Sequence, residues 1–457
     1  MHHRYIGDKA FYRRVFGVAV PIIIQNGITN FVSLLDNIMV GQVGTVPMSG
    51  VSIVNGLLFV FNLCVFGASS GAGIFTAQFY GSKDDEGIRH TFRFKFLICI
   101  VISLVGAAIF LLGGSSLIGL YLTGEGDAAT AAGALDHGLK YLAIMLWGFL
   151  PFALTNTYSS TLRETGETFI PMLGGIAAVF VNLVLNYILI FGKFGAPEMG
   201  VEGAAIATFI SQLVGGVLPV FYFIDRSNSS RLHLCKTSFY SKVLRDACIN
   251  GSSELMTNLS MSLVNILYNY QLLRLAGENG VAAYGVIMYA AFLFVAVFVG
   301  YAVGSAPIVS FHYGARNHAE VHNLYRKSLR LIAVVAVTLT LASMFIIPCV
   351  ARIFVGYDAE LLALTSRAFR LYALSFLIMG FNVYASSFFT ALGDGVTSAL
   401  ISFLRTLAFQ VIAILLLPLL LGIDGIWLAV TAAELAALAV SAAMLLTKDK
   451  VFHYRKA

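Results

Sequence analysis

Long apolar segments, separated by short polar stretches, follow one another along the 457-residue chain. Most of them reach the roughly 20 residues that an α-helix needs to cross a bilayer. Helices are the only reasonable structure at this length, because lipid offers no partner to an unpaired backbone group. We therefore predict twelve transmembrane helices, at about residues 15–40, 51–80, 96–113, 140–162, 168–192, 201–225, 243–273, 281–312, 328–349, 368–391, 396–421 and 423–447.

The composition agrees with an integral membrane protein. Hydrophobic residues make up 58% of the chain and charged residues only 11%, whereas soluble domains carry about 25% charged residues. The net charge of +6 does not indicate nucleic-acid binding, since the basic residues lie in short loops between the apolar segments. The five cysteines share no close spacing, so we expect neither a metal site nor a disulfide framework.

The distribution of Lys and Arg predicts the orientation. One set of segments holds 22 of the 29 basic residues, and such a bias marks the cytoplasmic side. We therefore expect both termini in the cytoplasm and a multi-pass protein of a bacterial inner membrane. The basic set comprises the N-terminal tail, the segments near 81–95, 163–167, 226–245 and 313–330, and the C-terminal tail.

The two halves of the chain repeat each other. The stretch from Gly67 to Lys83 matches the stretch from Gly300 to Arg316 at an offset of 233 residues. Two further matches relate Asn156-x-Tyr158-x-Ser160 to Asn382-x-Tyr384-x-Ser386, and Gly200-Val-Glu-Gly203 to Gly422-Ile-Asp-Gly425. An even number of helices separates equivalent positions, so the halves have the same orientation. We predict an N-lobe at 1–225, a cytoplasmic loop at 226–245 and a C-lobe at 246–457. Parallel repeats of this kind are typical of transporters that alternate access.

Asp36 is the most informative single residue. It lies near the end of the first apolar segment, where an unused carboxylate would be costly. Asn182 and Asn186 are four residues apart, so they share one face of the fifth helix, and they lie at a matching depth. These three side chains could form an oxygen-ligand cation site or a proton site; hydrogen bonding between helices is the alternative. The residue equivalent to Asp36 in the second half is the neutral Asn269, so the site is expected in the N-lobe only.

Other polar residues fall within the apolar segments. Glu254, Arg405 and Glu434 all belong to the predicted C-lobe. They could act as gate charges or substrate contacts, or they could form a structural ion pair, for instance Arg405 with Glu434 or Glu254. Residues of this kind face the interior of a helix bundle or a hydrated cavity. Candidate substrate-cavity residues are Gln25, Asn26, Asn30, Glu254, Asn258, Asn265 and Asn269.

The chain lacks the sequence patterns of enzymes. No phosphate-binding loop, HExxH zinc motif or GxSxG nucleophile motif is present. We therefore expect no enzymatic activity and no cofactor beyond a coupling Na⁺ or H⁺. The expected partners are a small-molecule substrate and the lipid bilayer, with no nucleic acid, and the protein is expected to be a monomer.

Several of these patterns together resemble the multidrug and toxic compound extrusion (MATE) transporters. They are Pro21-x3-Gln25 with Leu35-Asp36-Asn37-Ile38-Met39-Val40-Gly41, the Tyr80-Gly81 and Tyr313-Gly314 pairs, Asn182-x3-Asn186, and Gly200-Val-Glu-Gly203 through Thr208. The resemblance implies twelve helices in two lobes and export by antiport against Na⁺ or H⁺. It also implies that Asp36 is the coupling residue, completed by Asn182, Asn186 and Thr208. The chain departs from the family at Asn186, where an acid is common, and Glu254 lies too early to match the coupling glutamate of other branches.

The resulting hypothesis is secondary active efflux of small amphiphilic compounds, with cationic ones favoured, coupled at Asp36. A first alternative is a flippase for lipid-linked saccharide precursors on a related fold, which would be expected to have a strongly cationic cavity. A second alternative is a membrane-embedded receptor or enzyme, which would be expected to cluster acids, histidines or metal ligands within the spans.

Overall fold

The computed structural model describes residues 39–122, 128–224, 240–356 and 358–454, together with Gly17, Ile24 and Asp36, except for the side chains of a few residues in these ranges. Every regular element in the described residues is a helix. The chain divides into two compact units, of which one is Val20–Gly251 and the other continues from Ser252. We call them the N-terminal and the C-terminal unit.

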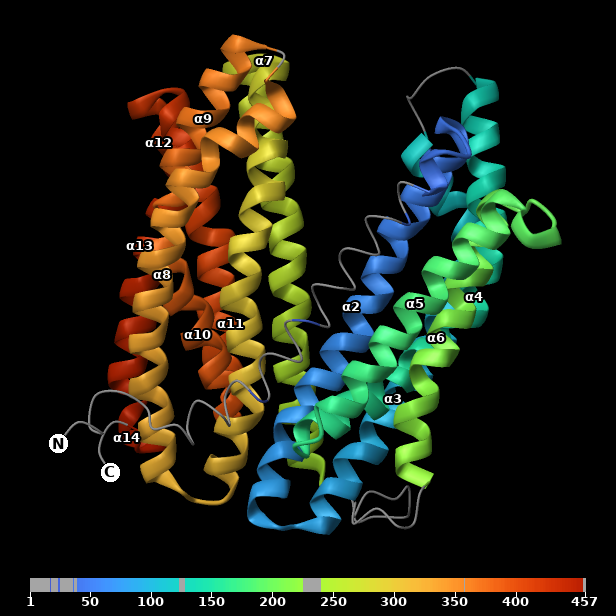
Figure 1. The fold of residues 1–457 in the computed structure, drawn as a ribbon. Helices are drawn as coiled ribbons and strands as arrows, with labels where there is room; N and C mark the ends of the chain where they lie inside the picture. The colour runs from blue at the N-terminus through green and yellow to red at the C-terminus, as the bar shows by residue number, and fades with distance from the viewer. Residues whose placement is uncertain are drawn as a thin grey trace. The chain divides into compact units, whose positions relative to one another are not determined.

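The N-terminal unit is a bundle of long helices (Figure 1). Its described helices are α2 (Thr45–Ser82), α3 (Asp85–Leu122), α4 (Ala128–Glu164), α5 (Phe169–Phe191), η2 (Lys193–Gly195) and α6 (Gly200–Ile224). The first part of α7 (Ser241–Gly314) also belongs to this unit, up to Gly251. There α7 passes close to α2, since a Cβ added to Gly67 would lie 2.8 Å from the carbonyl oxygen of Gly251. Small residues therefore allow the two backbones to meet, as is common between membrane helices.

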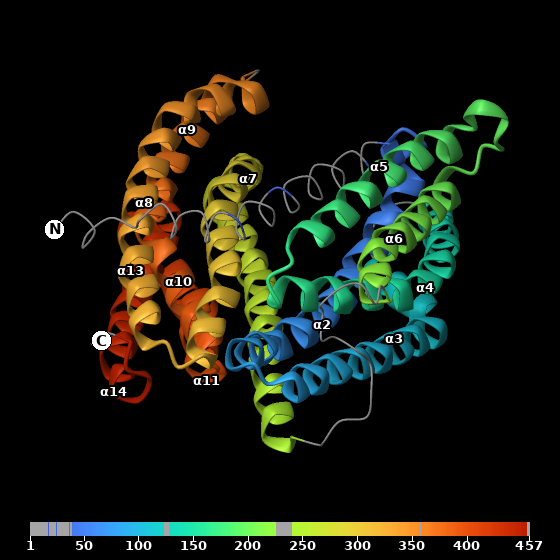
Figure 2. The same cartoon turned by 60° about the horizontal axis from the view of Figure 1, so that its bottom comes forward.

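The C-terminal unit contains the rest of α7 and all later helices (Figure 2). They are α8 (His318–Val355), α9 (Ala359–Ala373), α10 (Phe376–Leu392), α11 (Gly395–Phe403), the π-helix η3 (Leu404–Ala408), α12 (Phe409–Leu421), α13 (Ile423–Thr447) and α14 (Asp449–Phe452). Asp side chains begin two of them. Asp358 accepts from the backbone N–H groups of Glu360 and Leu361, and Asp394 accepts from that of Thr397, which satisfies donors that a helix start leaves unpaired.

The repeat seen in the sequence is present in the backbone. Lys83 and Arg316, 233 residues apart, both adopt left-handed conformations, with φ of 60° and 55°. Their N–H groups donate to the carbonyls of Tyr80 and Tyr313, which occupy equivalent positions. Few non-glycine residues have positive φ, so this shared turn is strong support for a duplicated fold.

α7 is long enough to cross a membrane twice. It has 74 residues, and Gly277 interrupts it with φ of 61° and ψ of −153°. The break lies between the two predicted helices at 243–273 and 281–312. The two arms pack against each other, because Tyr268 of the first stacks on Tyr284 of the second at 5.1 Å.

Several predicted boundaries were wrong. α8 begins at His318 rather than near 328. α3 begins at Asp85 rather than near residue 96, because Asp84 accepts from the N–H of Gly87 and starts the helix within the charged stretch. α4 begins at Ala128 rather than near 140, since its alanine-rich first turns favour a helix. The single helix predicted at 368–391 is a broken span, in which α9 and α10 meet at an angle of 46°.

Within the described residues, nine helices are long and apolar enough to cross a membrane, or ten if α9 and α10 form one span. Two crossings by α7 would add one more. The first predicted span, 15–40, falls largely outside the described residues. The described part of the chain therefore accounts for eleven of the twelve predicted crossings.

Candidate ion-coupling site

Asp36 contacts the polar face of α5. The Nδ2 group of Asn186 donates a hydrogen bond to Oδ1 of Asp36. Asn182 lies one helical turn away on the same face, and both asparagines are buried, with 5% and 1% of their surfaces exposed. The structure thus brings together the three residues that the sequence placed at a common depth.

Asn182 also lies against the carboxylate of Asp36. With its amide oriented so that both ends have partners, Nδ2 donates to Oδ1 and Oδ2 of Asp36 at 2.9 and 3.2 Å. The Thr208 hydroxyl lies 3.4 Å from the other end of this amide. Amide N–H donors of this kind stabilise a charged carboxylate.

Close packing of α5 on α6 positions these side chains. A Cβ added to Gly174 would lie 2.7 Å from the carbonyl oxygen of Gly215, and one added to Gly203 would lie 2.7 Å from that of Leu189. Glycine at such positions allows membrane helices to approach closely. Thr208 on α6 therefore lies within hydrogen-bonding distance of Asn182.

Tyr141 on α4 is a further member of the site. Its side chain is 5% exposed, its hydroxyl donates to Oδ1 of Asn55 on α2 at 3.2 Å, and it interacts with Asp36 and Thr208. Sequence reasoning missed it, because one tyrosine on an apolar helix carries no pattern that distinguishes it from the other nineteen. Tyr141 is therefore bonded to α2 and lies within electrostatic range of the carboxylate.

The atoms around Asp36 that could bind a cation are oxygen atoms of a carboxylate, of amides and of a hydroxyl. Oxygen ligands suit hard cations such as Na⁺, and Oδ1 of Asn186 is buried with no partner in the described structure. The same groups suit a proton shared between a carboxyl and an amide oxygen. The residues present therefore fit either ion, and Asp36 supplies the only formal charge among them.

The C-terminal unit holds a different buried carboxylate. Glu434 on α13 is 1% exposed and accepts at Oε2 from Nδ2 of Asn382 at 2.7 Å. Its Oε1 lies 3.3 Å from Arg405, which η3 presents. Arg405 and Glu434 were predicted to be either gate charges or a structural ion pair, and their contact favours the structural ion pair.

The remaining candidates fall into two groups. Gln25, Asn26, Asn30 and the side chain of Glu254 lie outside the described residues. Asn258, Asn265 and Asn269 lie on the first arm of α7, in the C-terminal unit.

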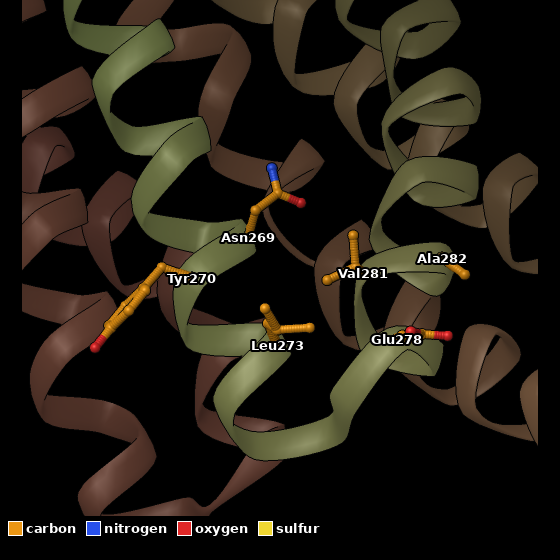
Figure 3. Close-up of a pocket in the computed structure, with 6 residues that line it drawn as sticks. All are labelled: Asn269, Tyr270, Leu273, Glu278, Val281 and Ala282. Atoms are coloured by element: carbon orange, nitrogen blue, oxygen red, sulfur yellow. The ribbon is translucent and has the colours of Figure 1, made fainter. Parts of the chain in front are cut away.

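Asn269 lines a pocket of about 510 Å³ between the two arms of α7. Leu273 and Val281 face each other across it, while Tyr270 and Glu278 point in different directions (Figure 3). The six lining residues are Asn269, Tyr270, Leu273, Glu278, Val281 and Ala282. The walls are mainly apolar, with an amide and a carboxylate at the edge.

We predicted that Lys95 and Glu164 lie in loops. This prediction is wrong, because the two residues form a buried ion pair. Lys95 on α3 is fully buried and contacts Glu164, the last residue of α4, with 2.5 Å between Nζ and Oε2. The two residues are 69 positions apart. Charges at the ends of apolar segments are normally solvated, so only the tertiary structure could reveal this pair.

The many apolar helices of the described residues define a multi-pass membrane protein, with a carboxylate that contacts amides of its N-terminal unit. The MatE family model matches residues 21–188 and 255–416. The chain belongs to this family, the multidrug and toxic compound extrusion transporters.

Individual relatives agree with the family assignment. The probable multidrug resistance protein NorM of Thermotoga maritima is 25% identical over 426 residues, which cover 92% of this chain and 89% of the relative. The probable multidrug resistance protein YoeA of Bacillus subtilis is 25% identical over 281 residues, covering 59% and 57%.

Solved structures show the same fold. One describes an outward-facing multidrug resistance MATE family transporter, with a TM-score of 0.86 and 21% identity over 97% of both chains. Another describes MATE in a bent conformation, with a TM-score of 0.87 and 20% identity over 96% of both chains. The chain therefore has the twelve-helix, two-lobe fold predicted from its sequence.

Proposed function

We propose that the protein exports small amphiphilic compounds, with cationic ones favoured, by antiport against Na⁺ or H⁺ at Asp36. One observation carries the proposal. Glu164 and Glu434 contact a Lys or an Arg, whereas within the described part of the chain Asp36 has hydrogen bonds with neutral amides and no ion pair.

Neutral partners allow the charge of Asp36 to change. A lysine or arginine would stabilise the carboxylate and oppose its neutralisation. An amide offers either an N–H donor to the charged form or an oxygen to a proton or cation. A change of charge inside the membrane has a large effect on solvation, so ion binding at Asp36 favours one arrangement of the lobes over the other.

The driving force is sufficient for export. Moving one charge across a potential of 100 mV supplies about 2.3 kcal/mol, and the concentration gradient of the ion adds to this. A free energy of this size shifts the equilibrium between two conformations about fifty-fold. The relatives named as multidrug resistance proteins favour chemically varied cargo.

We further propose the arrangement that the charge distribution indicates. Both termini lie in the cytoplasm of a bacterial inner membrane, and the lobes 1–225 and 246–457 are joined by the loop 226–245. The protein acts as a monomer, in contact with lipid and a small-molecule substrate, without nucleic acid and without a cofactor other than the coupling ion. A flippase for lipid-linked saccharides would need free cationic groups in its cavity, and the contact of Arg405 with Glu434 argues against that alternative.

Efflux from proteoliposomes tests the proposal. Purified protein is reconstituted, loaded with a fluorescent amphiphilic cation, and subjected first to a Na⁺ gradient and then to a pH gradient. We expect at least one gradient to drive efflux, and we expect Asp36→Asn to abolish it while the melting temperature stays within a few degrees of wild type. Efflux by Asp36→Asn at the wild-type rate would refute the assignment of Asp36.

A further inference from the structure

The segment that follows α13 folds back onto the C-terminal unit. After the short helix α14, His453 adopts a left-handed conformation with φ of 51°. Tyr454 then enters the unit and is fully buried, with 0% of its surface exposed. The neighbouring Val451 is 64% exposed and Phe452 is half-buried against Tyr313, so Tyr454 is the most deeply buried residue of the segment.

Tyr454 contacts three helices. Its ring centroid lies 5.2 Å from that of Tyr325 on α8 and 5.1 Å from that of Phe388 on α10. Its hydroxyl donates to the carbonyl oxygen of Leu445 on α13 at 2.8 Å. Its own carbonyl oxygen accepts from Nδ1 of His322 on α8 at 3.0 Å. The ring, the hydroxyl and the carbonyl oxygen of Tyr454 therefore all have partners.

An ion pair fixes the start of the same segment. Lys448 Nζ donates to Oδ2 of Asp394 at 2.8 Å. Asp394 in turn accepts at Oδ1 from the N–H of Thr397 and begins α11. Burial alone would raise the pKa of Asp394, but the hydrogen bonds from Lys448 and Thr397 outweigh it and lower the pKa below its ordinary value. The segment is thus attached at both ends.

The N-terminal unit has an aromatic cluster at the equivalent position, and this cluster consists of residues of α3, α4 and α6. Phe223 on α6 lies 5.1 Å from Phe92 on α3 and 4.7 Å from Tyr158 on α4. The offsets of the sequence repeat, 233, 226 and 222 residues, relate Phe92 to Tyr325, Tyr158 to Tyr384 and Phe223 to Leu445.

The C-terminal unit keeps two of these rings but has leucine in the third position. Tyr454 bonds to the backbone of that leucine and places its ring against Tyr325 and Phe388, while Tyr384 contacts Phe388. We infer that the segment Lys448–Tyr454 is an intramolecular clasp, in which the ring of Tyr454 packs on Tyr325 as Phe223 packs on Phe92 and so joins the ends of α8, α10 and α13. The inference concerns the integrity of the unit and holds whichever ion or substrate the protein carries.

Thermal melting and hydrogen exchange of the full-length protein in detergent test the clasp. Tyr454→Ala removes the ring, so we expect the melting temperature to fall by on the order of 5 °C or more. We also expect faster exchange at the start of α8 and the end of α10, with α3 and α6 unchanged. Val451→Ala, in the same segment but exposed, is the matched control and should behave as wild type.

Two further variants keep the test decisive. Tyr454→Leu retains apolar volume without a ring, and it replaces Tyr454→Ala if that variant cannot be purified. Tyr454→Ala combined with Leu445→Phe offers a ring from α13 into the vacated space, and we expect it to recover part of the lost melting temperature. Wild-type melting and exchange in Tyr454→Ala or Tyr454→Leu would overturn the clasp. No recovery in the double variant would overturn the equivalence with Phe223.

Discussion

The buried pair Lys95–Glu164 offers a direct test of the N-terminal unit. Lys95 is fully buried, and Glu164 is 9% exposed. The carboxylate of Glu164 packs against the bare Cα of Gly73, where an added Cβ would collide with it. Lys95→Met keeps most of the length of the side chain but removes its charge, so it leaves the carboxylate of Glu164 in a closely packed site without the lysine that contacts it.

The expected cost of this change is large. Removing one partner of a buried ion pair destabilises a protein by about 3–5 kcal/mol, because the other charge stays buried without compensation. Replacing both partners by neutral groups is often close to neutral. At about 2–4 °C per kcal/mol for a large domain, Lys95→Met should lower the melting temperature by roughly 10 °C, and Lys95→Met with Glu164→Gln should recover most of this loss.

The assay is thermal unfolding of the purified protein in detergent, with all variants measured at one pH and one salt concentration. Glu164→Gln alone leaves Lys95 buried without a counter-ion and should lose a comparable amount. A double-variant cycle then isolates the interaction between the two side chains. Equal melting temperatures for Lys95→Met and the double variant would refute the reasoning.

Two further predictions concern charge. Asn186→Asp would place a second carboxylate within about 4 Å of Asp36, which gives a repulsion of about 4 kcal/mol at an effective dielectric constant of 20. We expect Na⁺, compared with choline, to raise the melting temperature of this variant more than it raises that of wild type. An equal response of the two proteins would contradict the geometry at Asp36. The pKa of Asp394, lowered by Lys448 and Thr397, predicts that its contribution to stability is present above about pH 4 and is lost as the pH falls through the lowered pKa. Asp394→Asn should remove that part of the acid sensitivity in melting curves between about pH 3 and 6, and an unchanged profile would contradict it.

Much of the candidate site could be predicted from the sequence. Asn182 and Asn186 share a helix face because they are four residues apart, and counting along two spans placed Asp36 at their depth. These are local relations that helical geometry determines. Thr208 entered only through the family resemblance, and the close packing of α5 on α6 explains why it lies beside Asn182.

Other features depend on tertiary structure and carry no local signal. Tyr141 and the pair Lys95–Glu164 could not be identified from spacing. The break between α9 and α10 occurs at Leu374 and Ser375, without the proline or glycine that usually marks one. The clasp at Tyr454 involves contacts with residues up to 132 positions away.

Under the proposed function, the repeat explains why the change of charge would be confined to one unit. Asp36 in the N-terminal unit is equivalent to the neutral Asn269, whereas Glu434 in the C-terminal unit is equivalent to the neutral Gln212. The first acid contacts amides, and the second contacts Arg405 and Asn382. Since the charge of Glu434 is balanced within its own unit, protonating it would leave Arg405 uncompensated and would be costly. Neutralising Asp36 leaves no unbalanced base among its described contacts. In the proposed mechanism, an ion that binds at Asp36 changes the net charge of the N-terminal unit alone, and this asymmetry gives a two-unit protein a reason to prefer different arrangements with and without the ion.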